Sequence, residues 1–102
     1  MKRHFLVGLV LAVLATAGGA AQAANLMRGQ QIYQMHCAAC HGLRGEGVAP
    51  DAPKFQLGER LDQPDVMLMQ SVKTGSKTMP PFFGVLKDPE ILDVLGYART
   101  LR

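Results

Sequence analysis

Five consecutive residues carry the clearest chemistry in the chain: Cys37-Ala38-Ala39-Cys40-His41. On a helix, positions i, i+3 and i+4 share one face, so both thiols and the imidazole can face one flat ligand. This C-x-x-C-H spacing is the attachment signature of c-type haem, in which the thiols bond to the porphyrin and the histidine ligates the iron. The motif therefore predicts one haem c attached through Cys37 and Cys40, with His41 as an axial ligand.

Three other uses of these residues fit less well. A thioredoxin-like redox pair needs a βαβ context, and no strand-like run precedes Cys37. A structural zinc site needs about four Cys or His ligands, whereas the chain has two Cys and three His, with His4 in a segment expected to be removed. A disulfide between residues three apart on one helix has poor geometry and leaves His41 without a role.

The N-terminal region has the features of a secretory signal peptide. Lys2 and Arg3 supply positive charge, residues 5–17 are largely apolar, and Ala21-Gln22-Ala23 offers a small-residue cleavage site. The alternative is an uncleaved anchor, but the apolar run is short for a spanning helix of ~20 residues. We therefore expect a signal peptide over residues 1–23, a single domain over 24–102 and no stable membrane anchor after cleavage.

Removal of this segment changes the charge balance. Lys2 and Arg3 are two of the 11 Lys and Arg residues, so nine remain against eight Asp and Glu. Without a clear basic excess, nothing favours binding to nucleic acid. A domain of this size is near the lower limit for a stable core and usually needs a staple, a role that a covalent haem would fill. We therefore expect the haem-free mature chain to be largely unfolded.

The fold class expected for the mature chain is all-α, with about three main helices and loops rich in glycine and proline. Residues that recur at helical spacing predict a first helix from about Asn25, as its N-cap, to Ala39. A second helix is expected over 64–74, capped by Asp62 or Gln63 and ended by Gly75.

The last helix has the clearest pattern. Asp88 is the expected cap and Pro89 the first helical position. The apolar stripe consists of Ile91, Val94, Leu95, Ala98 and Leu101. This stripe predicts a helix that buries one face along its whole length.

A second axial ligand must come from elsewhere in the chain. Met79 is favoured, because Pro80 and Pro81 after it make a stiff, extended loop and thioether sulfur suits haem iron. The alternatives are that Met79 is an ordinary buried methionine or that the position is open. The other candidates lie beside the motif or in a predicted helix: Met27, Met35, His36, Met67 and Met69.

Four motifs in order resemble small bacterial class I cytochromes c, and they cover nearly all of the mature chain. They are Gly29-x-x-x-Tyr33-x-x-x-Cys37-x-x-Cys40-His41, then His41-Gly42-x-x-Gly45-x-Gly47 followed by Pro53-Lys54-Phe55, then Gly75-x-x-x-Met79-Pro80-x-Phe82, and finally Glu90-Ile91-x-x-Val94-x-x-Tyr97-x-x-x-Leu101.

The resemblance implies a cytochrome c fold around one haem, with Met79 as the second axial ligand. It implies that the N- and C-terminal helices cross and that Gly29 admits the ring of Tyr97. It also implies that the carbonyl of a loop proline orients the Nδ1 hydrogen of His41. By the family pattern this proline is Pro53, with Pro50 as the alternative.

Two filled axial positions leave the iron no open site, whereas haem enzymes that activate oxygen or peroxide keep one free. We therefore expect an electron carrier and not an enzyme, in the periplasm of a Gram-negative bacterium, cycling between Fe(III) and Fe(II). Two alternatives stay open. The chain could be a cytochrome subunit of a larger periplasmic oxidoreductase complex, or a haem protein that handles gases or peroxide.

The expected partners are redox proteins, one donor and one acceptor. Aromatic side chains of Phe82 and Phe83 could form an apolar docking centre. Basic side chains around a haem edge can steer an acidic partner, or they can be scattered solvated surface. Those near the expected edge are Lys54, Lys73, Lys77 and Lys87.

Overall fold

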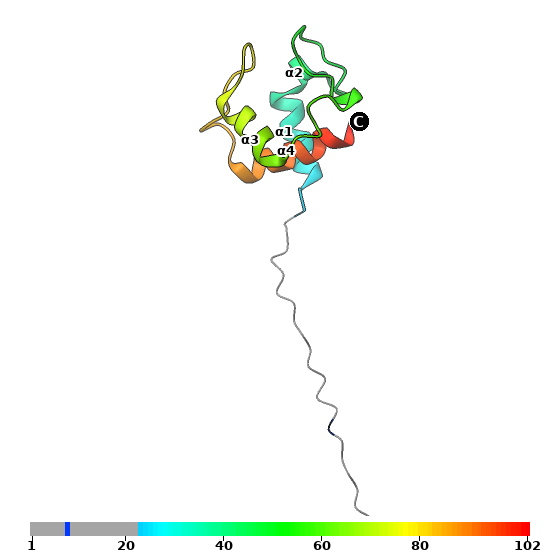
Figure 1. Cartoon of the computed structure of the whole chain (residues 1–102), viewed down its shortest axis with the longest axis vertical. Coiled ribbons are helices and arrows are strands. Elements are labelled where there is room, and N and C mark those ends of the chain that lie inside the picture. Colours follow the sequence, from blue (N-terminus) through cyan, green and yellow to red (C-terminus); the bar gives the residue numbers. More distant parts are fainter. Residues whose placement is uncertain (1–7, 9–22) are drawn as a thin grey trace, which may run out of the picture.

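The computed structural model describes Gly8 and residues 23–102 (Figure 1). Apart from Gly8 and Ala23, the predicted signal peptide lies outside the described residues. Within them the fold is all-α, as expected, and no helix is long and apolar enough to cross a membrane. The elements are α1 (Leu26–His36), α2 (Ala38–His41), the short 3-10 helix η1 (Phe55–Leu57), α3 (Asp65–Thr74) and α4 (Asp88–Thr100).

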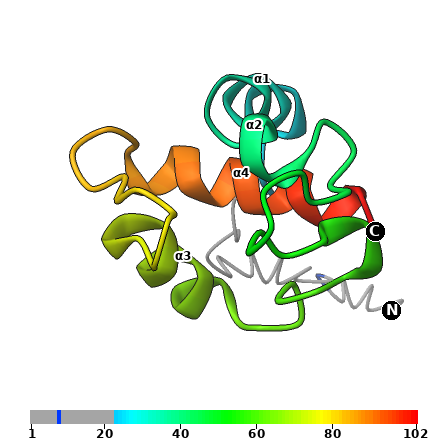
Figure 2. The same cartoon turned by 90° about the horizontal axis from the view of Figure 1, so that it is seen from above.

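Helices α1 and α4 cross and form the main packing contact, as the resemblance implied (Figure 2). Ile32 and Tyr33 of α1 are buried against the α4 stripe, in which Ile91, Val94, Leu95 and Ala98 are also buried. The predicted role of Gly29 needs a correction. A Cβ at this position would overlap the backbone carbonyl of Asp93 and lie 3.1 Å from the Cβ of Tyr97. Gly29 therefore makes room mainly for the α4 backbone, while the Tyr97 ring packs edge-on to Tyr33 at 5.3 Å.

The start of α1 is tied to the middle of α4. Asn25 is the N-cap, as predicted, and its side chain accepts a hydrogen bond from the Arg28 N–H at 3.1 Å. The buried carboxylate of Asp93 accepts from the Asn25 N–H at 2.8 Å and from Arg28 Nε at 2.5 Å. These bonds satisfy a charge that would be costly to bury alone.

The prediction of one continuous helix to Ala39 is wrong. The first helix ends at His36, and Cys37 separates it from α2 with φ −118°. The Cys37 carbonyl accepts from both Cys40 and His41 N–H groups, at 3.3 and 2.9 Å. This shared acceptor tightens the turn that carries the motif. Helix α2 then ends at Gly42, whose φ is +87°.

Two predicted helix starts also need correction. For α3 the N-cap is Pro64, whose carbonyl accepts from Met67 and Leu68 N–H groups, so neither Asp62 nor Gln63 caps it. The Pro64 carbonyl thus accepts the first hydrogen bonds of the helix, and no side chain caps its first turn. The buried residue of this helix is Leu68, whereas Met67 is 56% exposed and not in the core.

For α4 the N-cap is Lys87 and not Asp88. The Glu90 carboxylate accepts from the Lys87 N–H at 3.0 Å, which is the reciprocal half of a capping box. Asp88 is instead the first helical residue and pairs with Lys73 of α3 at 2.9 Å. Pro89 is therefore the second helical residue and not the first, as was predicted, although it still lies in the first turn.

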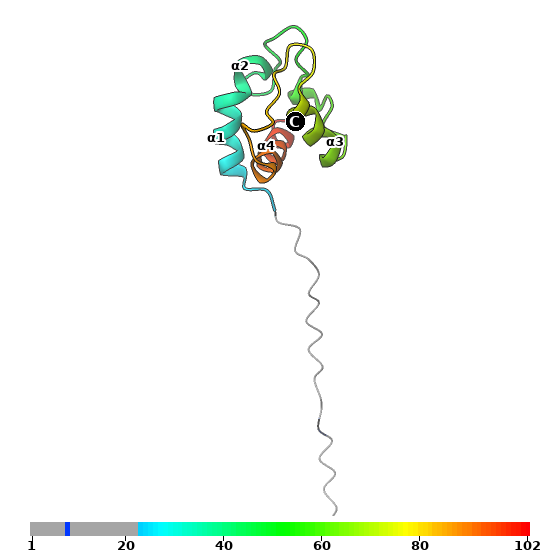
Figure 3. The same ribbon diagram turned by 90° about the vertical axis from the view of Figure 1, so that its left-hand side faces the viewer.

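Arg99, near the end of α4, holds the 58–64 segment between η1 and α3. Its Nε donates to the Leu61 carbonyl at 3.4 Å and its Nη2 to the Gln63 carbonyl at 3.2 Å. Its Nη1 pairs with the Asp65 carboxylate. Figure 3 shows α1 and α3 on opposite sides of α4, so this clasp closes the side away from α1.

Candidate functional site

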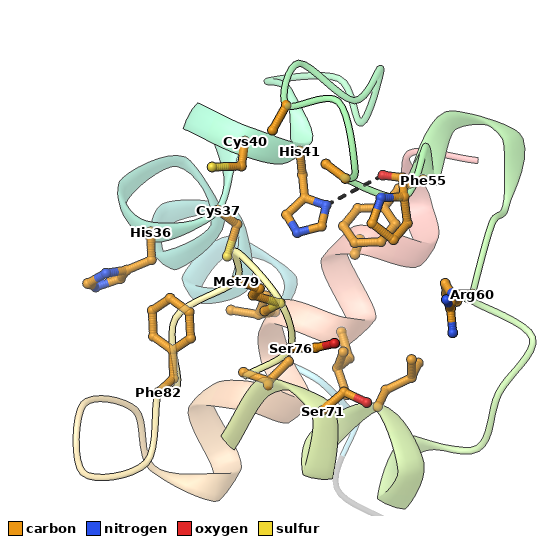
Figure 4. A pocket seen from close by; sticks show the side chains of 18 of the residues that line it. His36, Cys37, Cys40, His41, Phe55, Arg60, Ser71, Ser76, Met79 and Phe82 are labelled. Atoms are coloured by element: carbon orange, nitrogen blue, oxygen red, sulfur yellow. Dashed lines mark hydrogen bonds between the residues drawn. The ribbon is translucent and has the colours of Figure 1, made fainter. Parts of the chain in front are cut away.

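A cavity of about 240 Å³ lies between the α1–α2 turn, the loop after α3 and the buried face of α4. Cys37, Cys40, His41 and Met79 all line it, although they come from two segments far apart in the chain (Figure 4). Much of the remaining wall is apolar, and it includes Leu68, Phe82, Val94 and Leu95 among its members.

The imidazole of His41 is buried, and its orientation defines its protonation. Nδ1 lies 3.4 Å from the carbonyl oxygen of Pro53, so Pro53 and not Pro50 makes this contact. Because a carbonyl can only accept, the proton belongs on Nδ1 and the Nε2 lone pair is left for a metal. Burial lowers the pKa of His41, against the opposing effect of this hydrogen bond, and so favours the neutral ring.

The two thiols lie on the same side of the cavity as His41 and are free. Cys37 is half-buried and Cys40 is exposed. Burial, with a smaller contribution from Cys40, raises the pKa of Cys37 to about 11. Both sulfurs are therefore available for attachment to one ligand and not consumed in a disulfide.

Backbone hydrogen bonds hold this side of the cavity, which we call the His41 wall (residues 37–58). The Gly47 N–H donates to the His41 carbonyl at 2.8 Å, and the N–H groups of residues 48 and 49 both donate to the Cys40 carbonyl at 2.9 Å. From α1, the buried Tyr33 hydroxyl donates to the Gly42 carbonyl at 2.6 Å. The wall is thus bonded both internally and to the core.

Met79 belongs to a different structure, the Met79 loop (residues 75–83). Its backbone exchanges two hydrogen bonds with Ser76, at 2.8 and 3.1 Å, and the Phe82 N–H then donates to the Val72 carbonyl at 3.0 Å. Gly75 permits this tight turn. Its φ is +70°, and a Cβ there would lie 2.6 Å from the Met79 carbonyl oxygen.

Among the methionines of residues 23–102, Met79 is the one that lines the cavity. Met27 and Met35 are 77% and 76% exposed on α1. The His36 ring points away from the cavity centre in Figure 4 and meets the Phe82 ring edge-on at 5.8 Å. The structure therefore brings together the sulfur and imidazole groups that the sequence singled out; of the other candidates, only His36 also lines the cavity.

Sequence reasoning missed the contact between Phe55 and His41. Its ring is stacked on the imidazole of His41, with centroids 4.4 Å apart and planes at 10°. The available signal was its place in the Pro53-Lys54-Phe55 motif, which does not by itself indicate what the ring contacts.

The residues present fit a covalently attached haem. Two free thiols and an imidazole with an available Nε2 face the cavity from one side, and a thioether lines it from the Met79 loop. Soft sulfur and imidazole are both ligands that haem iron accepts. The surrounding apolar side chains match the largely apolar faces of the macrocycle.

Comparisons with known proteins agree with this chemistry. Residues 24–97 match the family model described as "Cytochrome C oxidase, cbb3-type, subunit III". Cytochrome c6 of Thermosynechococcus vestitus is 36% identical over 104 residues, covering 95% of this chain and 90% of the relative. The chain belongs to the monohaem class I cytochromes c. Within this class it is a cytochrome c6-like electron carrier and not an enzyme, and membership implies covalent haem c.

Two further relatives support the assignment to this class. Cytochrome c6 of Cyanidium caldarium is 33% identical over 95 residues, covering 89% of this chain and 84% of the relative. The solved structure of cytochrome c6 from the diatom Phaeodactylum tricornutum is 32% identical. It superposes with a TM-score of 0.61 over 74% of this cytochrome and 91% of the diatom chain. The expected cytochrome c fold is thereby confirmed.

Proposed function

We propose that this cytochrome is a periplasmic electron carrier with one haem c attached through Cys37 and Cys40 and ligated by His41 and Met79. The observation that carries the proposal is the meeting of these four side chains in one apolar cavity. The carbonyl of Pro53 belongs to the same site because it accepts from Nδ1 of His41.

The haem supplies the change between Fe(III) and Fe(II) when bound. The residues of the chain would keep the structural rearrangement that accompanies this change small. Backbone hydrogen bonds hold the segments that carry His41 and Met79, and these segments would keep both side chains near the iron in either oxidation state. Apolar side chains exclude water and so favour the oxidation state of lower charge. If His41 and Met79 both ligate the iron, no substrate would have a place at the metal.

The proposed location depends on the N-terminal region. A signal peptide over residues 1–23 would be removed after Ala23, leaving a domain over 24–102 that begins directly before α1. Ala24 already packs on α4, where a Cβ at Gly96 would lie 2.6 Å from its Cβ. N-terminal sequencing of the secreted protein tests this, and a first residue inside α1 would contradict it.

For partners, we propose redox proteins with an acidic docking surface. Lys54, Lys77 and Lys87 are exposed, and Lys77 lines the rim of the cavity. Lys73 contributes less, since it pairs with Asp88. Electrostatic steering predicts that the rate of electron transfer falls as salt rises. A rate that is independent of ionic strength would remove the acidic partner from the proposal.

The visible spectrum of the holoprotein, oxidised and reduced, tests the ligation. We expect sharp low-spin c-type bands, and the weak far-red sulfur-to-iron band in the oxidised form. In Met79→Ala this band should disappear and the reduction potential should fall, because soft sulfur stabilises Fe(II). A low-spin Met79→Ala protein with an unchanged potential would exclude Met79 as the ligand.

A second candidate is a cytochrome subunit of a larger periplasmic complex, which the description of the matching family model favours. Gentle purification of the native protein distinguishes the two. A free carrier elutes alone, whereas a subunit elutes with an oxidoreductase. Rapid binding of carbon monoxide to the reduced form would instead indicate an open iron site and a ligand-handling protein.

A further inference from the structure

We infer that Phe55 is a positioning residue that sets the plane of the His41 imidazole and shields it from water. This inference rests on the proposed ligation of iron by His41. The two rings lie nearly parallel, with centroids 4.4 Å apart and planes at 10°. Such a stack constrains the whole face of the imidazole and not a single atom.

The contact between His41 and the Pro53 carbonyl does not by itself fix the plane of the imidazole. Nδ1 to the Pro53 oxygen is 3.4 Å, longer than the usual 2.7–3.2 Å of an N–H···O bond. A single long bond tolerates rotation of the ring about the line that joins the two atoms. Pro53 and Phe55 are two residues apart, so one segment holds the edge and the face of the imidazole together.

Phe55 is itself held on several sides. Its carbonyl accepts from the Gly58 N–H at 2.9 Å, and its neighbour Gln56 donates to the Gly45 carbonyl at 2.9 Å. The Tyr33 ring lies 6.4 Å away. Gly45, at φ +73°, lies so close that a Cβ there would come 2.9 Å from the Cβ of Phe55. The backbone and the Cβ of Phe55 are therefore fixed beside His41.

Two measurable properties of the iron depend on this arrangement. The plane of an axial imidazole determines the magnetic anisotropy of low-spin Fe(III), which EPR and paramagnetic NMR detect. Apolar cover over the ligand disfavours the higher positive charge of Fe(III). Loss of the flat ring should therefore alter the spectroscopic pattern and also lower the reduction potential.

The test compares Phe55→Leu with Phe83→Leu, the same change at a ring that is 77% exposed and outside the cavity lining. In Phe55→Leu we expect a reordering of the haem methyl shifts, altered EPR g values and a severalfold shift of the equilibrium with a redox mediator towards the oxidised form. Phe83→Leu should match wild type in the methyl shifts, the g values and the mediator equilibrium, which involve no docked protein partner. Phe55→Tyr keeps a flat ring and should restore the wild-type pattern.

The far-red sulfur band separates this inference from the proposed ligation. If wild type shows the band while Phe55→Leu keeps the wild-type methyl order, g values and potential, the positioning role is wrong and the ligation stands. If wild type lacks low-spin spectra, both fail. Should Phe55→Leu not fold, wild-type holoprotein still decides, because the stack requires NMR cross-relaxation between the two rings, and its absence would overturn the inference.

Discussion

The His41 wall and the Met79 loop each carry one of the two proposed iron ligands, yet they are built in different ways. The wall has internal backbone bonds, a buried side-chain bond from Tyr33 to Gly42 at 2.6 Å and a ring stack on the ligand itself. The loop has a two-bond turn at Ser76 and Met79, followed by two bonds to α3. Ser76, Lys77 and Thr78 are all exposed.

This difference indicates where the site should open first. Local stability follows buried contacts and protected backbone bonds, and the wall has more of both. The imidazole side should therefore behave as a fixed platform, whereas the thioether side should be the first to detach under stress. The predictions below test that asymmetry, from the largest expected effect to the smallest.

Removal of the two haem-attaching thiols should prevent both the His41 wall and the Met79 loop from folding. In a Cys37→Ala, Cys40→Ala double variant without haem, we expect a largely unfolded chain, because so small a domain lacks a sufficient core of its own. Circular dichroism checks this against wild-type holoprotein. A strongly helical signal from the haem-free variant would show that the packing of α1 on α4 suffices.

Gly75→Ala should open the Met79 side alone. The change forces a Cβ against the Met79 carbonyl and Pro81 nitrogen at φ +70°. We expect loss of the far-red sulfur band and gain of carbon monoxide binding. Gly84→Ala is the matched control, since φ is +79° there but nothing lies within 4 Å of the added Cβ. It should cost only the backbone strain, about 1–2 kcal/mol. Equal effects of the two variants would contradict the argument.

Tyr33→Phe should weaken the wall without affecting the sulfur ligand. Deleting the hydroxyl leaves the buried Gly42 carbonyl without this donor, at a cost of about 1–3 kcal/mol. Denaturant unfolding of the holoprotein measures the loss, and the far-red band should persist. Tyr97→Phe is the control, because no hydrogen bond of the Tyr97 hydroxyl is found among the described residues. Loss of the band in Tyr33→Phe would mean that the two sides are coupled.

The smallest effect is expected at the partly exposed pair of Lys73 and Asp88, which joins α3 to α4. Such pairs contribute about 0–1 kcal/mol and are screened by salt. Lys73→Gln should therefore leave unfolding and the sulfur band nearly unchanged. A fall of several kcal/mol in the free energy of unfolding would show that α3 stabilises the Met79 loop more than this ion pair and the backbone hydrogen bonds indicate.

Periodicity and motif spacing predicted the parts of the fold that depend on local pattern. The apolar stripe of Ile91, Val94, Leu95 and Ala98 is buried as expected, because the helical period places these residues on one face. The motif residues and Met79 line one cavity as expected. They could be identified from the sequence because few kinds of side chain can attach or ligate a haem.

What was missed depends on contacts between distant residues. The stack of Phe55 on His41 requires the path of the loop from 42 to 54, which no periodicity describes. Gly29 signalled a close approach, but the Asp93 carbonyl as its cause was visible only in the packed helices. Likewise, Asp88 was a reasonable cap by residue type, yet Glu90 reaches back to Lys87 and starts the helix one residue earlier than a cap at Asp88 allows.

Arg99 links the end of α4 to segments made earlier, through carbonyls at residues 61 and 63 and the carboxylate of Asp65. During synthesis, the cysteines of the attachment motif emerge long before this arginine does. Until α4 has emerged, α1 lacks its partner helix and the 58–64 segment lacks its clasp. A nascent chain therefore presents its thiols on an open polypeptide, and a version that stops at Ala98 would lose the contacts of Arg99.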